Sequence, residues 1–177
     1  MSLKKNVFKI ILFGDSNVGK TTLVKKLVSD KFNEKTTKTI GVEFRSKIRY
    51  IDNLAVTLQI WDFSGEERFN FLLEMYCKGV VGGIFVFDMT NNESMLNLNK
   101  WISKVRSYTY VDFPILIVGT KQDLVIRKIA EEKEYSKKDD KDSSDFFTCS
   151  AKTGENVDLI FQTLAERIYS IQKEKAD

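Results

Sequence analysis

Apolar residues along this chain fall into two alternating patterns, one typical of β-strands and one typical of α-helices. A short apolar run at 7–13 is followed by Leu23, Val24, Leu27 and Val28 at helical spacing, and similar alternation continues toward the C-terminus. The other strand-like runs lie at 83–88, 115–118 and 146–149, and helices are expected around Met95, Leu98, Ile102 and Val105, over 130–138, and from near Thr153-Gly154 past Ile168.

Two neighbouring segments, 42–50 and 54–61, alternate strictly between apolar and polar residues. Asp52-Asn53 between them is a turn sequence, so the pair predicts a hairpin that adds one antiparallel edge strand. The buried strands separated by helices predict the rest of an α/β fold, a mostly parallel six-stranded sheet with helices on both faces. No repeat, long linker or low-complexity tract interrupts the pattern, and we expect one domain over residues 1–177.

Composition narrows the functional classes. The 177 residues are 42% hydrophobic and 30% charged, as in an ordinary folded domain, and the net charge of +3 is too small to indicate nucleic-acid binding. The absence of histidine excludes imidazole catalysis and histidine-ligated metals. Cys77 and Cys149 stand in apolar settings and predict buried thiols in a reducing compartment. No apolar run reaches membrane-spanning length and residues 1–5 lack a signal-peptide core, so we expect a cytoplasmic protein.

The strongest chemical signature is the stretch from Gly14 to Thr21, which matches the phosphate-loop pattern G-x-x-x-x-G-K-S/T between a strand and a helix. Its glycines allow a tight turn in which backbone N–H groups point at one anion, and the helix behind adds its positive end. Lys20 is expected on the outer phosphates and the hydroxyl of Thr21 on Mg²⁺. The residues expected to bind phosphate are Asp15, Ser16, Asn17, Val18, Gly19, Lys20, Thr21 and Thr22.

Ligands of such sheets bind beyond the carboxyl ends of the strands, and three further motifs fall on that edge. Asp62 to Gly65 follows an apolar strand, which suits a carboxylate on Mg²⁺ and a glycine beside a terminal phosphate; an ordinary turn fits equally well. In 120–123 the carboxylate of Asp123 could accept hydrogen bonds from guanine N1–H and its 2-amino group, which adenine lacks, while the stem of Lys121 covers the base. Ser150-Ala151-Lys152 could offer backbone N–H groups to a base carbonyl.

These motifs, in this order, resemble the Ras superfamily of small GTPases from about Lys4 to about Gln172. Residues 39–44, 59–62 with 66–69, and 82–88 resemble its Rab branch in particular. The resemblance implies a P-loop G-domain that binds GTP or GDP with Mg²⁺ and slowly hydrolyses GTP, in vesicle or membrane trafficking.

The resemblance also assigns individual residues. It names the loop around Thr39 switch I and the region from Asp62 to about Tyr76 switch II. Thr39 joins Thr21 and Asp62 as a metal ligand, although five threonines between 21 and 39 prevent its selection on chemistry alone. The assigned nucleotide contacts are Phe32 and Gly65 with Thr120, Lys121, Asp123, Ser150, Ala151 and Lys152; the effector patch is Ile40, Phe44, Trp61 and Tyr76. Trp61 points away from the apolar face of its strand, which favours an exposed aromatic patch over core packing.

The chain departs from the family at Glu66, where glutamine is usual, with Ser64 in place of the usual alanine. A glutamine both donates to and accepts from the attacking water, whereas a carboxylate only accepts. Repulsion of the γ-phosphate, roughly 3 kcal/mol at about 6 Å and an effective dielectric near 20, would slow hydrolysis. Acceptance of the water's proton would sustain it, with Glu66, Lys20 and Gly65 as the catalytic set. The sequence leaves both outcomes open.

The sequence is therefore compatible with three functions: a GTP-hydrolysing switch, a hydrolysis-impaired GTP-loaded docking module, and, least favoured, an ATP-dependent kinase or ATPase. Thr120 replaces the asparagine common in the family, but Asp123 retains the guanine-selecting carboxylate. Residues 74–78 differ from the usual Rab sequence, so the resemblance does not identify the binding partners of this chain.

The resemblance implies binding of effectors, an exchange factor and a GTPase-activating protein through the switches, by a monomer that binds no nucleic acid. Rab proteins attach to endomembranes through a prenylated C-terminal tail. This chain ends in Lys175-Ala176-Asp177 without a terminal cysteine, and we expect a truncation before such a tail rather than a missing anchor.

Overall fold

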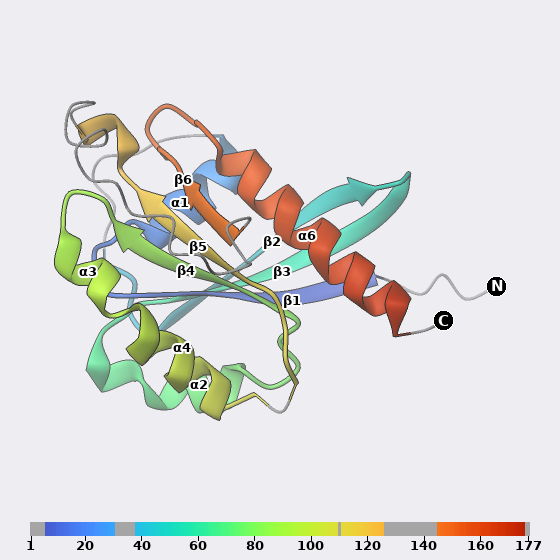
Figure 1. Cartoon of the computed structure of the whole chain (residues 1–177), viewed down its shortest axis with the longest axis horizontal. Coiled ribbons are helices and arrows are strands. Elements are labelled where there is room, and N and C mark those ends of the chain that lie inside the picture. Colours follow the sequence, from blue (N-terminus) through green and yellow to red (C-terminus); the bar gives the residue numbers. More distant parts are fainter. Residues whose placement is uncertain (1–5, 31–37, 110, 126–144, 176–177) are drawn as a thin grey trace, which may run out of the picture.

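The computed structural model describes residues 6–30, 38–109, 111–125 and 145–175, and these form a sheet flanked by helices on both faces (Figure 1). Within the described residues the sheet has six strands in the order β2-β3-β1-β4-β5-β6. They are β1 (Asn6–Phe13), β2 (Val42–Ile51), β3 (Leu54–Phe63), β4 (Gly82–Asp88), β5 (Ile115–Thr120) and β6 (Phe146–Thr148).

All strand pairs in the sheet are parallel except the predicted hairpin of β2 and β3, which is antiparallel and places β2 at one edge. Its turn residues Asp52 and Asn53 have φ of 47° and 66°, a left-handed conformation that Asn and Asp tolerate better than most residues. The α/β fold class and the six-stranded, mostly parallel sheet are thus confirmed.

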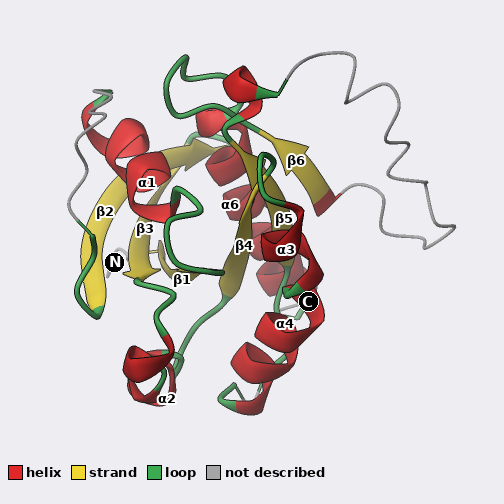
Figure 2. Cartoon of the chain, turned by 90° about the vertical axis from the view of Figure 1, so that its left-hand side faces the viewer, coloured by secondary structure: helices red, strands yellow, loops and turns green. Residues whose placement is uncertain are grey.

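Two helices, α1 (Lys20–Ser29) and α6 (Val157–Glu174), pack on one face of the sheet. On the opposite face lie α2 (Phe71–Tyr76) and α4 (Leu98–Ser107), as the turned view shows (Figure 2). The other helical elements among the described residues are α3 (Asn92–Leu96) and the single 3₁₀ turns η1 (Glu67–Phe69) and η2 (Gln122–Leu124).

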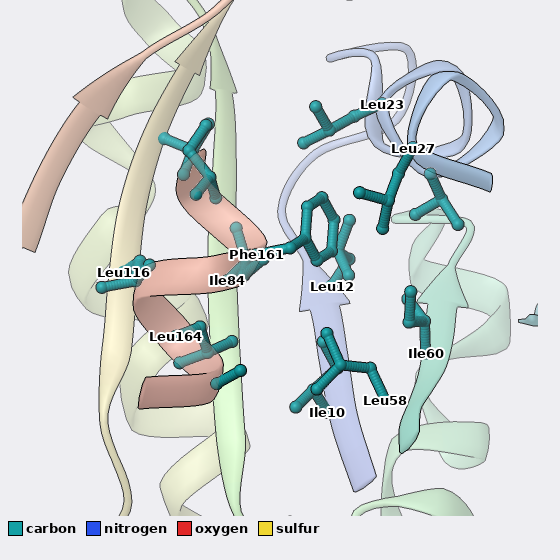
Figure 3. Close-up of a cluster of buried hydrophobic side chains, with 14 of the residues drawn as sticks. Ile10, Leu12, Leu23, Leu27, Leu58, Ile60, Ile84, Leu116, Phe161 and Leu164 are labelled. Atoms are coloured by element: carbon teal, nitrogen blue, oxygen red, sulfur yellow. The ribbon is translucent and has the colours of Figure 1, made fainter. Parts of the chain in front are cut away.

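The sheet separates two apolar cores, because successive side chains of a strand point to opposite faces. On the α1 and α6 side, Ile10 and Leu12 of β1 pack with Phe161 of α6 (Figure 3). On the other side, Ile11 and Phe13 of the same strand belong to the cluster that includes the α4 residues. Burial of β1 on both faces fixes the position of the loop that follows it.

Some predicted elements have different limits. The helix expected around 95–105 is divided at Asn97 into α3 and α4. The terminal helix begins at Val157, after Asn156 with φ of 58°, rather than near Gly154. The helix predicted over 130–138 lies outside the described residues.

Both cysteines are free and buried, as predicted. Burial raises the pKa of the Cys77 thiol to about 11 and that of Cys149 to about 12, which keeps both thiols neutral near pH 7. No helix among the described residues has the length and apolarity to cross a membrane.

Replacement of Phe161 by Ala should lower the free energy of unfolding by about 3–5 kcal/mol, because this fully buried ring would leave a cavity in the α6 core. The measurement is urea denaturation at a fixed nucleotide concentration, because bound ligand adds to apparent stability. Phe71→Ala serves as the control, since that ring is 59% exposed and its loss should cost about 1 kcal/mol or less. Equal losses for the two variants would contradict the assigned core.

Candidate nucleotide-binding site

The phosphate loop, residues 14–19, connects β1 to α1 at the carboxyl edge of the sheet. A Cβ atom at Gly14 would stand 2.1 Å from the carbonyl oxygen of Val86 in β4, so the loop backbone lies against the neighbouring strand in a way only glycine allows. At the start of α1, Gly19 offers no side-chain cap and the first turn carries no acidic residue. The positive end of this helix is therefore open to an anion.

Lys20, the first residue of α1, is a buried cation enclosed by this loop, with 3% of its surface exposed. Its Nζ donates to the carbonyl oxygens of Gly14 at 3.0 Å and Asp15 at 2.5 Å, and lies 3.4 Å from that of Ser64. Burial lowers the pKa of Lys20 to about 8, although the nearby carboxylates of Asp62 and Asp15 act to raise it. A phosphate group would supply the full negative charge that carbonyl dipoles lack.

Three oxygen-bearing side chains converge beside Lys20. The hydroxyls of Thr21 and Thr39 are 2.5 Å apart, and Thr21 also donates to Oδ2 of Asp62. Asp62 is 1% exposed, and its Oδ1 is buried without a hydrogen-bond partner among the described residues. Burial raises the pKa of this carboxyl group to about 6, against the opposing effects of the Thr21 hydrogen bond and of Lys20.

An orphaned buried carboxylate oxygen beside two hydroxyls is a donor set that suits a hard cation such as Mg²⁺. The structure thus brings together Thr21, Thr39 and Asp62, the three residues predicted to hold the metal. A divalent ion would also relieve the cost of burying the charge of Asp62.

Switch II lies against the phosphate loop at Gly65, which has φ of 79°. A Cβ atom at Gly65 would lie 2.3 Å from the carbonyl oxygen of Gly14, so a larger residue would push the two loops apart. The next residue, Glu66, is only partly exposed at 24%, and its carboxylate accepts a hydrogen bond of 2.8 Å from Nε of Arg68. The negative charge that sets this chain apart is therefore paired within switch II.

At the far end of the site, Thr120 connects the predicted base loop to the phosphate loop. Its buried hydroxyl lies 2.5 Å from the carbonyl oxygen of Val18 and 3.0 Å from that of Phe87. The carboxylate of Asp123 accepts a 2.6 Å hydrogen bond from the hydroxyl of Ser150. The loops after β5 and β6 are joined at this point.

The other predicted base-loop residues have varied surroundings. Lys121 has φ of 60°, and its Nζ lies 2.5 Å from Oδ2 of Asp88, so its stem is fixed by an ion pair. Ala151 is half-buried and Lys152 is exposed. Phe32, expected against the guanine, lies outside the described residues.

Three of the four residues of the predicted effector patch, Phe44, Trp61 and Tyr76, form one aromatic group with unequal exposure. The Trp61 ring has its centroid 5.1 Å from that of Phe44 and 4.8 Å from that of Tyr76. Phe44 and Ile40 are 51% and 80% exposed, but Trp61 and Tyr76 are half-buried, less open than expected for an exposed patch. Nζ of Lys9 lies 5.0 Å above the Trp61 ring, which explains part of this burial.

Sequence reasoning missed two residues at the site, Asn97 and Trp101, which donate hydrogen bonds to the carboxylate of Asp15. Trp101 lies on the apolar face of α4, where the sequence pattern predicts an ordinary core residue. Nothing in the local pattern links Asn97 or Trp101 to the phosphate loop, which lies more than 80 positions earlier.

A phosphate loop at the end of a central parallel strand, with a Thr-Thr-Asp cluster on one side and a loop bonded to it on the other, defines the G-domain class of P-loop proteins. The Ras family model matches residues 9–170, and the chain belongs to the Ras family.

Rab-named proteins are among its relatives. It is 36% identical to Ras-related protein Rab-11C of Dictyostelium discoideum over 169 residues, which cover 96% of this chain and 75% of that protein. Identity to Ras-related protein RABA4d of Arabidopsis thaliana is 35% over 170 residues, 96% of this chain and 77% of the relative. Ras-related protein RGP2 of Oryza sativa is 33% identical, with 96% and 78% covered. The predicted Rab-like small GTPase, a GTP-hydrolysing switch, is confirmed.

Thr120→Val should be less stable than Thr120→Ser, although valine retains the volume and adds apolar surface. Valine removes the hydroxyl that donates to the carbonyl oxygens of Val18 or Phe87 and leaves them without this donor, which should cost about 1–3 kcal/mol. Serine keeps the hydroxyl and loses roughly 1 kcal/mol of methyl burial. Urea denaturation of both variants makes the comparison. A valine variant at least as stable as the serine variant would show that the link between the loops contributes nothing.

Proposed function

We propose that the phosphates of GTP or GDP bind at the phosphate loop and the first turn of α1, residues 14–22, with the guanine at Asp123. The observation that supports this most strongly is the bond from Thr120 to Val18, because it brings the base-selecting loop into contact with the phosphate loop. The remaining proposed nucleotide contacts are Phe32, Gly65, Lys121, Ser150, Ala151 and Lys152.

Thr21, Thr39 and Asp62 would hold the Mg²⁺ that the family uses. When bound, the ion neutralises charge on the phosphates. Lys20 and the loop N–H groups add fixed positive charge where negative charge develops on the transferring group. Lys20 is already enclosed by carbonyl oxygens, so little reorganisation is needed to place it.

For hydrolysis, Glu66 accepts the proton of the attacking water, and Arg68 compensates part of its charge. This pairing weakens the repulsion of the γ-phosphate that an isolated glutamate would exert, which supports turnover over the docking-module alternative.

Thr39 and Gly65 link the nucleotide to partner binding. Loss of the γ-phosphate would release both residues and relax the switches. Effectors, an exchange factor and a GTPase-activating protein would bind here, with Ile40, Phe44, Trp61 and Tyr76 as the effector surface. In the cell we expect a monomer peripheral to an endomembrane, attached through C-terminal lipidation.

Asp123→Ala should abolish the preference for guanine. Two charge-assisted hydrogen bonds to the base are worth about 3 kcal/mol or more together, so GDP affinity should fall by roughly 100-fold and approach that for ADP. Competition against a fluorescent GDP measures both nucleotides. Asp112→Ala, at an exposed site in an ion pair with Arg106, is the matched control and should retain guanine preference. If ADP displaced the fluorescent GDP from the unmodified protein at concentrations similar to those of GDP, the assignment of Asp123 to the guanine would be overturned.

Glu66→Gln should slow single-turnover GTP hydrolysis by about tenfold, because the amide cannot take up the proton of the attacking water. Rapid mixing of GTP-loaded protein with Mg²⁺ and quantification of released phosphate gives the rate. The control is Glu67→Gln, which makes the same charge change one residue further on, in the ion pair with Lys100, and should leave the rate nearly unchanged. Faster hydrolysis in Glu66→Gln would favour the GTP-loaded docking module instead.

A further inference from the structure

Asp15, the second residue of the phosphate loop, has its carboxylate bonded to the helices beside the loop. Oδ2 accepts a 2.8 Å hydrogen bond from Nδ2 of Asn97, at the junction of α3 and α4. Oδ1 accepts a 2.7 Å bond from Nε1 of Trp101 in α4. Each carboxylate oxygen thus has its own donor, from two residues one helical turn apart.

The backbone of Asp15 supports two groups of the proposed nucleotide site. Its carbonyl oxygen accepts the 2.5 Å bond from Nζ of Lys20. Gly65 packs so closely that a Cβ there would stand 2.6 Å from the carbonyl carbon of Asp15. A shift of Asp15 would therefore displace Lys20 and the Gly65 segment of switch II together.

The charge of Asp15 is a hazard in a loop that must receive phosphate. A carboxylate free to rotate toward the phosphates would repel them, and charge-assisted hydrogen bonds to neutral donors are a strong means of holding it elsewhere. The donors are themselves constrained, because Trp101 is only 7% exposed and packs in the core beneath α4. The break in the helix at Asn97 leaves this side chain beside the loop.

We propose that Asn97 and Trp101 are positioning residues for nucleotide binding: they hold the Asp15 carboxylate away from the phosphates and thereby set how slowly the nucleotide leaves. This rests on the proposed phosphate site. The proposal gives a role to the junction of α3 and α4, which supplies none of the predicted nucleotide contacts. It requires that Asn97 and Trp101 both act through Asp15.

The test is the release rate of fluorescent GDP from Asn97→Ala and Trp101→Phe, chased with excess GDP in Mg²⁺. Each variant loses one bond to a carboxylate, so each should release GDP roughly tenfold faster. Asn99→Ala, the same substitution at an exposed position of α4, should release GDP at the unmodified rate. Unchanged release in Asn97→Ala, measured on protein with a normal thermal midpoint, overturns the proposal even if Trp101→Phe folds poorly.

Repetition in an Asp15→Ala background separates positioning from general packing. Without the carboxylate, Asn97→Ala and Trp101→Phe should have no further effect on release. If either still accelerates release tenfold, its effect does not pass through Asp15 and the proposal fails. If the unmodified protein binds no GDP in Mg²⁺, the proposed nucleotide site itself is wrong, a result distinct from normal binding with insensitive variants.

Discussion

The structure depends on the enclosure of one cation, Lys20, at the end of the central strand. Because β1 is buried on both faces, the loop that follows it has a fixed position, and Lys20 is surrounded there by carbonyl oxygens. Its charge is incompletely compensated, as its lowered pKa reflects. The free-energy cost of burying the Lys20 charge would be offset by a bound anion. The open N-terminus of α1 and the cluster of Thr21, Thr39 and Asp62 favour the same ligand, a phosphate with its metal.

Much of this arrangement could be predicted from sequence because it rests on local rules. Apolar runs located four of the six strands in the described residues, and the alternation on either side of Asp52-Asn53 located the other two as an antiparallel hairpin. The phosphate loop is short and needs glycine at Gly14, so its pattern identifies it directly. Ligands of parallel sheets bind at the carboxyl ends of the strands, and this rule predicted that the other motifs lie at the same edge as the phosphate loop.

The remaining features arise from contacts between distant segments, or from side-chain directions in irregular turns, and local patterns encode neither. The helix predicted around Asn97 is interrupted at this residue, whose side chain donates a hydrogen bond to Asp15, 82 positions earlier. Trp61 follows the alternation of its strand, yet Lys9 and Tyr76 cover it, so its exposure was overestimated. The pairing of Glu66 with Arg68 depends on side-chain direction in an irregular turn, and it changes how the unusual glutamate should be interpreted.

The most direct test of the central claim is a crystal structure of the protein with GDP and Mg²⁺. One bound nucleotide should contact Nζ of Lys20 with its phosphates and the carboxylate of Asp123 with its base, with the metal among Thr21, Thr39 and Asp62 or the waters they hold. A nucleotide bound elsewhere, or a purine that does not reach Asp123 while its phosphates contact Lys20, would contradict the account.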